Sequence, residues 1–431
     1  MELFERPKHG DKAILVQISL NKNKDSYEQT EFRALVRSAG ARDLELITGT
    51  RHAPDPKYFV GSGKAEEIKL FVRQHGADVI IFDHSLSPAQ ERNLETLIEC
   101  RVLDRTGLIL DIFAQRAQSH EGKLQVELAQ LKHMSTRLIR GWTHLERQKG
   151  GIGMRGPGET QLETDRRLLN IRIKQINKRL QKVRNQREQG RQSRKKTETP
   201  TVALVGYTNA GKSTLFNRLT GSDVFAADQL FATLDPTLRH LNLPNQQKII
   251  LADTVGFIKD LPHDLIAAFR STLQETIEAD ILLHVIDTHD EQREMFRNEV
   301  NDVIAYIKAD HIPQIEVMNK IDYNDQEPRI DSEHNGLPTR VWLSAQTGDG
   351  LDALKTLISD HFKKSLFTGT IKLAPRYAAL RAKLYELKAI KSEDTTDKGE
   401  FSLSITIQNK ILKGILKNAD LSLEDIIPPS A

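Results

Sequence analysis

Residues 206–214 read Gly-Tyr-Thr-Asn-Ala-Gly-Lys-Ser-Thr and fit the phosphate-loop pattern GxxxxGK[ST]. An apolar run of strand length, Thr201–Val205, precedes them, and a segment with helical spacing, Leu215–Leu219, follows. A glycine turn between a strand and a helix directs backbone N–H groups at an anion. We expect the whole loop to contact a nucleotide: Gly206, Tyr207, Thr208, Asn209, Ala210, Gly211, Lys212, Ser213 and Thr214. Lys212 would reach the β- and γ-phosphates, and the Ser213 hydroxyl would bind magnesium.

The base is indicated by Asn319-Lys320-Ile321-Asp322, which follows the apolar strand 315–318 and fits the pattern NKxD. An aspartate at the last position accepts two N–H bonds from guanine. Adenine has no such donor pair and would leave the Asp322 carboxylate unpaired, at a high cost. Ser344-Ala345 follows a further apolar strand and resembles the loop that backs guanine. The sequence therefore predicts GTP and GDP as ligands.

Two further motifs predict the groups that respond to the γ-phosphate. Asp253-Thr254-Val255-Gly256 fits DxxG, in which Asp253 holds magnesium through a water and the Gly256 N–H contacts the γ-phosphate. The segment Phe231–Thr237 predicts a first switch, with nucleotide contacts from Phe231, Ala232, Thr233, Leu234 and Asp235. Thr233 and Thr237 both suit magnesium chemically, and spacing does not separate them. Five motifs in this order predict a GTP-hydrolysing domain.

Catalysis is expected to differ from that of Ras-type GTPases, which place a water-orienting glutamine directly after DxxG. Phe257 occupies that position, and its apolar ring cannot orient water. Asn209 resembles the asparagine of potassium-dependent GTPases, whose side chain helps to bind a monovalent cation between the phosphates, so K⁺ is a candidate cofactor beside Mg²⁺. An ordinary turn residue is the alternative interpretation of Asn209.

Charge is unevenly distributed along the 431 residues. Residues 166–196 hold thirteen Lys and Arg against one acid, whereas the rest of the chain has 49 basic and 58 acidic residues and a net charge of −9. This segment is therefore predicted to bind a polyanion, with nucleic acid favoured over a solvated helix face. The single cysteine, Cys100, and the absence of any apolar run near ~20 residues predict a cytoplasmic protein.

The patterning predicts a multidomain α/β protein with four parts: an α/β domain at 1–120, a basic helical hairpin with its linker at 121–199, a GTPase domain at 200–365 and a small α+β domain at 366–431. In the first domain we expect a parallel sheet with strands 13–18, 44–47 and 78–82 and helices 27–37, 64–75 and 88–100. Apolar positions such as Leu124, Leu128, Leu168 and Ile171 predict the hairpin, which is interrupted at 149–158 and ends near 192. Helix 374–388 and strand 401–408 are expected in the last domain.

The segment Gly150–Arg167, the phosphate loop, FATLDPT and DTVGF together resemble the HflX family of ribosome-associated GTPases, over nearly the whole chain. Gly156–Glu163 is the most specific piece. The resemblance implies that Thr233 is the switch ligand of magnesium. Together with Asn209, Lys212 and Gly256 from the motifs above, Thr233 forms the expected catalytic set. It also implies binding of the large (50S) ribosomal subunit. We expect a monomer that contacts this subunit and its rRNA, not DNA, through residues 140–196. Family members are associated with splitting stalled or idle ribosomes under stress.

Two alternatives remain open, an rRNA- or tRNA-maturation GTPase and an ATP-driven rRNA remodeller. The second depends on Phe59–Ala65, which has a Gly-Lys pair before a helix. This stretch lacks the first glycine of a phosphate loop and has Ala65 where Ser or Thr would bind magnesium. A helix-capping turn is the favoured interpretation, with weak ATPase activity and peripheral membrane contact left open.

Overall fold

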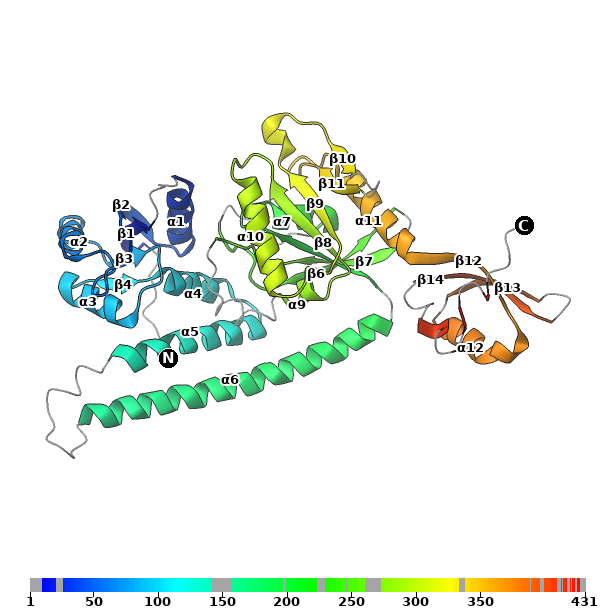
Figure 1. Cartoon of the computed structure of the whole chain (residues 1–431), viewed down its shortest axis with the longest axis horizontal. Coiled ribbons are helices and arrows are strands. Elements are labelled where there is room, and N and C mark those ends of the chain that lie inside the picture. The colour runs from blue at the N-terminus through cyan, green and yellow to red at the C-terminus, as the bar shows by residue number, and fades with distance from the viewer. Residues whose placement is uncertain are drawn as a thin grey trace. The chain divides into compact units, whose positions relative to one another are not determined.

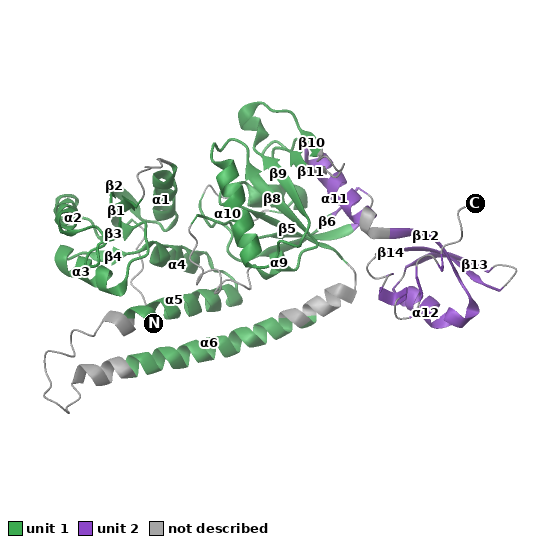
Figure 2. Cartoon of the chain, in the orientation of Figure 1, with its two compact units in different colours: residues 1–241, 248–349 green, residues 242–247, 350–431 purple. Residues whose placement is uncertain are grey.

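The computed structural model describes residues 10–20, 26–141, 157–196, 199–222, 229–244, 247–259, 273–332, 338–387, 389–395, 399–408 and scattered positions between 412 and 426. The chain divides into two compact units (Figure 2). The first unit comprises residues 1–241 and 248–349, and the second comprises residues 242–247 and 350–431. The domain boundaries expected from the sequence remain predictions.

The first unit begins with a parallel four-stranded sheet in the order β2-β1-β3-β4, which confirms the expected α/β arrangement. Its strands are β1 (Lys12–Ser19), β2 (Arg42–Thr50), β3 (Val79–Phe82) and β4 (Arg101–Leu103). Its helices are α1 (Ser26–Ser38), α2 (Ser62–His75), α3 (Pro88–Ile98) and α4 (Arg105–Arg116). The apolar runs of β1 and β3 are buried because helices cover both faces of such a sheet.

Two long helices follow, α5 (His120–Gly141) and α6 (Pro157–Lys196), and lie side by side (Figure 1). They share a buried apolar cluster of Leu124, Leu128, Leu131, Leu169, Ile176 and Leu180. Leu168 and Ile171, expected on the buried face, are exposed, and Leu169 packs instead. Although α6 spans 40 residues, no helix among the described residues is long and apolar enough to cross a membrane.

The bounds of α6 correct two expectations at its ends. Pro157 and Gly158, expected in a non-helical interruption, are its first residues, because proline is tolerated at the first helical position. Residues 192–196, expected in a linker, continue the helix, since Arg, Lys and Gln are good helix formers. The remainder of the predicted interruption, 149–156, and the expected helical residues 142–148 lie outside the described residues.

The second sheet has seven strands in the order β10-β11-β9-β8-β5-β7-β6. Its strands are β5 (Thr201–Gly206), β6 (Thr237–Asn242), β7 (Lys248–Asp253), β8 (Ile281–Asp287), β9 (Gln314–Asn319), β10 (Arg329–Ser332) and β11 (Pro338–Trp342). The described helices around it include α7 (Lys212–Thr220), α9 (Gln274–Ile277) and α10 (Arg293–Tyr306). Strands β7, β5, β8, β9 and β11 are parallel, so the loops at their carboxyl ends meet at one edge of the sheet.

The second unit contains helix α11 (Leu351–Ser365) and a three-stranded antiparallel sheet in the order β12-β14-β13. Strand β14 (Phe401–Gln408) lies where it was expected, whereas β12 (Leu366–Leu373) and β13 (Ile390–Thr395) were not predicted. The expected helix 374–388 is shorter. A 3₁₀ turn occupies Pro375–Tyr377 before α12 (Ala378–Glu386), and this turn begins at proline, whose fixed φ suits a helix start.

One hydrophobic core joins the two sheets of the first unit, and a buried polar cluster lies within the same joint. Arg105 Nη2 contacts Glu31 Oε1 at 2.7 Å, and its Nη1 contacts Asp83 Oδ1 at 2.5 Å. Burial alone would lower the pKa of Arg105, but the two carboxylates outweigh it and raise that pKa. Arg105 Nη2 also donates to the carbonyl of Lys259 at 3.0 Å, so the cluster ties the N-terminal sheet to the segment after β7.

Replacing Arg105 with Ala is expected to lower the free energy of unfolding by about 3–5 kcal/mol, because Glu31 and Asp83 would remain buried without a counter-charge. Chemical denaturation measures the change. Arg33→Ala is the matched control: its half-exposed pair with Asp43 is worth only about 0–1 kcal/mol. Equal losses for the two variants would contradict the structural role of the buried cluster.

Candidate functional site

A pocket at the carboxyl edge of the second sheet is formed by the predicted phosphate loop, the first switch and the DxxG segment. It is lined by Thr208, Asn209, Gly211, Lys212, Ser213, Thr214, Gln229, Phe231, Ala232, Thr233, Thr254 and Gly256. Two glycines permit the close approach of neighbouring groups. A Cβ on Gly206 would lie 2.3 Å from the Val285 carbonyl oxygen, and one on Gly211 would lie 2.2 Å from Asn319 Nδ2. Gly211 also has φ 93°, which favours glycine at the start of α7.

Lys212 is buried at the base of this pocket. Its Nζ donates to the backbone carbonyls of Gly206 at 3.0 Å and Tyr207 at 2.6 Å. Burial lowers the pKa of Lys212 to about 8, and the charge of Asp253 opposes this only in part. A phosphate group in the pocket would supply the negative charge that the buried ammonium lacks.

The three predicted magnesium residues converge on one another. Ser213 Oγ lies 2.9 Å from Thr233 Oγ1, and both hydroxyls donate to Asp253 Oδ2, at 2.8 Å and 3.0 Å. Burial raises the pKa of Asp253, and its other oxygen, Oδ1, is buried without a hydrogen-bond partner among the described residues. Mg²⁺ prefers oxygen ligands such as these, so the donor set fits this ion. Thr237 begins β6 and does not line the pocket.

The DxxG segment presents its backbone to the pocket. The Thr254 side chain donates to the Leu204 carbonyl at 2.6 Å, and Val255 is buried in the core. Gly256 lies against the loop, where an added Cβ would be 2.8 Å from Thr208 Cγ2. Phe257 is 1% exposed and exchanges backbone hydrogen bonds with Gly206 and Thr208. The position that holds glutamine in Ras-type GTPases therefore carries a ring that belongs to the core.

The predicted guanine loop is ordered by Asn319, whose Nδ2 donates to the Ala210 carbonyl at 2.8 Å and whose Oδ1 accepts from the Ala345 N–H at 2.9 Å. The side chain thus links the phosphate loop to the Ser344-Ala345 loop. Lys320 Nζ pairs with Asp287 at 2.7 Å, next to Ile321, which packs in a small apolar cluster.

Asp322 differs from its neighbours because its Oδ1 is buried and finds no hydrogen-bond partner among the described residues. A carboxylate oxygen in this position is costly unless a ligand donates to it. Guanine offers two adjacent N–H donors, which supports the role expected from the sequence.

The first switch is arranged differently from the expectation that all five of its residues face the nucleotide. Phe231, Ala232 and Thr233 line the pocket, whereas Leu234 and Asp235 do not. The Phe231 ring packs edge-on against Phe113, and Leu234 is buried. The Asp235 carboxylate accepts from the N–H groups of Gln118 and Ser119. These side chains therefore hold the switch against α4 and the start of α5.

Sequence reasoning missed Gln229, and it expected Tyr207 to contact the nucleotide, although the Tyr207 side chain does not line the pocket. Gln229 lines it and accepts a hydrogen bond from Arg116, which is 113 residues away in the chain. The Tyr207 hydroxyl donates to Glu31 and accepts from the Lys259 N–H at 2.8 Å. Burial and the Glu31 charge raise the pKa of Tyr207, so its phenol stays protonated. Because these contacts join segments that are distant in the chain, no local sequence pattern indicates them.

The second lysine motif, Phe59–Ala65, forms a different arrangement. Arg51 Nη1 donates to the Val60 carbonyl at 2.9 Å and occupies the space beside Gly61, where a Cβ would lie 2.1 Å from it. Lys64 Nζ pairs with Glu67 at 2.9 Å. Arg51 thus contacts the turn before α2, and Lys64 is paired with Glu67 rather than left for a phosphate, which favours the helix-capping interpretation of this turn.

Comparisons with known proteins cover nearly all of the chain. Family models match residues 26–114 (GTP-binding GTPase N-terminal), 116–194 (GTP-binding GTPase middle region) and 201–320 (50S ribosome-binding GTPase). A GTPase HflX from Escherichia coli K12 is 59% identical over 404 residues, which cover 94% of this chain and 95% of the relative. Another from Magnetococcus marinus is 45% identical over 357 residues, covering 82% of each.

Among solved structures, a crystal structure of SsGBP with GDP covers 82% of this chain and 99% of its own, at 25% identity and a TM-score of 0.47.

Replacing Asp322 with Asn is expected to weaken GTP binding at least about a hundredfold, because the amide N–H would face the guanine donors and two hydrogen bonds to a charged group would be lost. Xanthosine triphosphate, which has a carbonyl in place of the exocyclic amine, should bind this variant better than it binds the original protein. Equilibrium titration with fluorescent nucleotides measures both affinities. Asp325→Asn, three residues on and exposed, is the control and should leave GTP affinity unchanged. An unaltered preference for GTP in Asp322→Asn would contradict base recognition by Asp322.

Proposed function

Because the chain belongs to the HflX family of GTPases, we propose that its GTP form binds the large ribosomal subunit and splits stalled or idle ribosomes, with hydrolysis as the release step. The protein is a GTP hydrolase of a ribosome-associated family. The model matching residues 201–320 is described as a 50S ribosome-binding GTPase, which supports this choice of partner. A monomeric state and a cytoplasmic location, where ribosomes are found, are part of the proposal.

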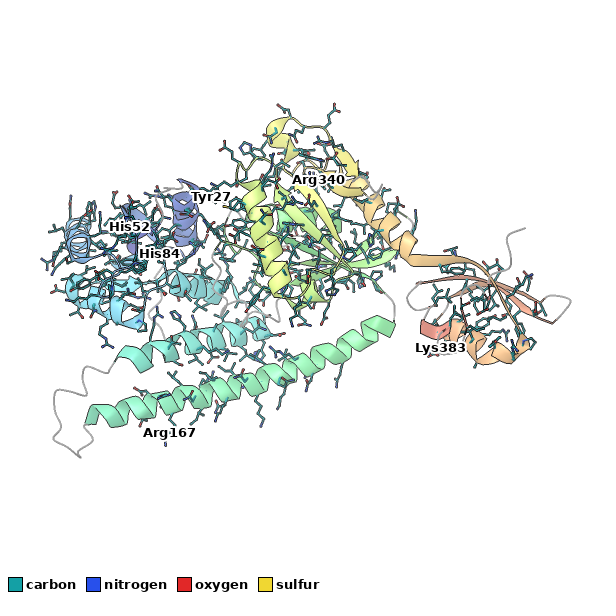
Figure 3. The ribbon with its side chains drawn as sticks, in the orientation of Figure 1. Tyr27, His52, His84, Arg167, Arg340 and Lys383 are labelled. Atoms are coloured by element: carbon teal, nitrogen blue, oxygen red, sulfur yellow. The ribbon has the colours of Figure 1, made fainter. Side chains whose placement is uncertain are left out.

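The observation that carries the proposal is the charge of α6. Between residues 166 and 186 the helix has eight Lys and Arg and no acid. Seven of them are exposed: Arg166, Arg167, Lys174, Lys178, Arg179, Lys182 and Arg184. Arg167 extends from the edge of α6 opposite to α5 (Figure 3). An exposed row of cations on a rigid helix suits the phosphates of rRNA, and binding by such a row weakens as salt rises.

The nucleotide site supports a mechanism based on charge and positioning. Ser213 and Thr233 would hold Mg²⁺ directly and Asp253 would hold it through a water, while Lys212 would neutralise the β- and γ-phosphates. Bound Mg²⁺ supplies charge for the leaving phosphate. Phe257 contributes no polar group, so a further charge is needed near the phosphates. Asn209 lines the pocket with an exposed side chain and φ 61°. We propose that this side chain helps to bind a potassium ion there.

GTP turnover is therefore expected to be at least about tenfold faster in KCl than in NaCl at equal ionic strength, as one well-placed charge lowers the barrier by more than about 1.4 kcal/mol. Phosphate release measures the rate in each salt. Asn209→Ala should abolish the difference while leaving nucleotide affinity nearly unchanged. Equal rates in the two salts would exclude a potassium role for Asn209.

The paired change Lys174→Gln and Lys178→Gln is expected to weaken binding to large subunits and to reduce the slope of log affinity against log salt by about 2, or about 1 per phosphate contact. Cosedimentation at several salt concentrations measures the slope. Lys248→Gln with Lys308→Gln removes the same charge from exposed sites elsewhere and is the matched control. Intrinsic GTP hydrolysis should be unchanged in both. Unaltered cosedimentation of the α6 variant would count against this helix as the contact.

The splitting step is tested by incubating the protein with intact ribosomes and GTP, GDP or a non-hydrolysable GTP analogue, and then separating subunits on a gradient. Both GTP and the analogue should produce free subunits, and GDP should not. The analogue should leave the protein on the large subunit, because release requires hydrolysis. Intact ribosomes under all three conditions would contradict splitting, whereas splitting with GTP alone would make hydrolysis the working step.

A further inference from the structure

Three alternate residues of the first switch, Phe231, Thr233 and Asp235, connect the nucleotide pocket to the N-terminal part of the chain. The Thr233 hydroxyl donates to Asp253 Oδ2 at 3.0 Å. On one side of it, the Phe231 ring lies 4.7 Å from that of Phe113 in α4. On the other side, Asp235 reaches the start of α5. The residues two positions before and after Thr233 thus both contact the N-terminal part of the chain.

The contact made by Asp235 is specific. Its Oδ2 accepts from the N–H groups of Gln118 and Ser119, both at 2.8 Å, and its Oδ1 accepts from Ser119 Oγ at 2.5 Å. Ser119 Oγ in turn accepts from the Gly122 N–H at 2.8 Å. A Cβ on Gly122 would lie 2.3 Å from Asp235 Oδ1, so only glycine leaves room for the carboxylate. The positive end of the α5 dipole adds to these hydrogen bonds.

The start of α5 is mechanically connected to the basic helix. α5 and α6 share the buried cluster that includes Leu128 and Ile176, and Arg172 pairs with Glu127 at 2.6 Å. A shift of the first turn of α5 is therefore passed to α6 through a packed interface, because packed side chains cannot deform independently.

We propose that Asp235 is a positioning residue: by binding the N-terminus of α5 it sets Thr233 at the magnesium site and transmits the nucleotide state to the α5–α6 hairpin. This inference rests on the proposed role of Thr233 as a magnesium ligand. When GTP and Mg²⁺ engage Thr233, the position of Asp235 is restrained through the single intervening residue Leu234, and the hydrogen bonds to Gln118 and Ser119 are stabilised. After phosphate release that restraint is gone, and these bonds loosen.

The positioning role is tested through the Mg²⁺ dependence of GTP hydrolysis in Asp235→Asn and Thr233→Ala. Asn keeps one carbonyl oxygen for the two N–H donors, so the variant retains its fold while losing the charge. We expect both changes to raise the half-saturating Mg²⁺ concentration, Asp235→Asn by about tenfold, and the double variant to add little beyond Thr233→Ala. Asp280→Asn is the matched control, since Asp280 also accepts from a backbone N–H, that of Thr201, at the opposite end of β5.

The outcomes separate this inference from the proposed function. If Thr233→Ala leaves the Mg²⁺ dependence unchanged, the assignment of Thr233 as a ligand is wrong. If Thr233→Ala raises it but Asp235→Asn behaves like Asp280→Asn, the assignment stands and the positioning role of Asp235 is wrong.

Transmission is tested by hydrogen exchange of the Gln118 and Ser119 amides in the full chain. In the original protein, a non-hydrolysable GTP analogue with Mg²⁺ should slow their exchange about tenfold relative to GDP with Mg²⁺. This difference should vanish in Asp235→Asn, while exchange in β8 stays the same in both proteins. A difference that persists in Asp235→Asn, or is absent from the original protein, would overturn the transmission through Asp235.

Discussion

The burial of Lys212 and Asp253 is the constraint on which the rest of the site depends. Burial lowers the pKa of Lys212 to about 8 and raises that of Asp253, so the fold holds both charges against their preference for water. Lys212 donates to two carbonyls, and one oxygen of Asp253 has no hydrogen-bond partner among the described residues. A triphosphate beside the lysine and Mg²⁺ beside the aspartate would supply the missing charges, so the ligand itself stabilises this part of the fold.

The N-terminal part of the first unit packs against the loops that carry these buried groups. One hydrophobic core runs from α1 and α4 to the phosphate loop and the first switch. Within it, the Tyr207 hydroxyl bonds Glu31, and Arg105 bonds both Glu31 and the Lys259 carbonyl. The phosphate loop is therefore attached to α1, the segment after DxxG to α4, and the first switch to α4 and the start of α5. In this arrangement the family's N-terminal and middle regions form part of the nucleotide site's scaffold.

Sequence patterns predicted the parts of the site that local backbone geometry determines. The motif 206–214, the NKxD motif and the DxxG motif each lie at a strand end, and their spacing is enough to bring them together. The direction of Asp235 and the contacts of Gln229 and Tyr207 were not predicted, because they depend on partners more than 100 residues away. The start of α6 was misplaced because glycine and proline at 156–158 resemble a loop, although proline also begins helices.

We propose that the loop cluster around Lys212, Asp253 and Asp322 is a magnesium-dependent, guanine-specific nucleotide site. Displacement of fluorescent GDP from the full chain by unlabelled GTP and ATP in the presence of Mg²⁺ tests it most directly. GTP should displace the probe at a concentration at least about a hundredfold lower than ATP, because ATP leaves the buried Asp322 oxygen unpaired. Chelation of Mg²⁺ should weaken the binding of GTP. Equal displacement by ATP and GTP would contradict guanine specificity. GTP binding that is unchanged by chelation of Mg²⁺ would contradict magnesium dependence.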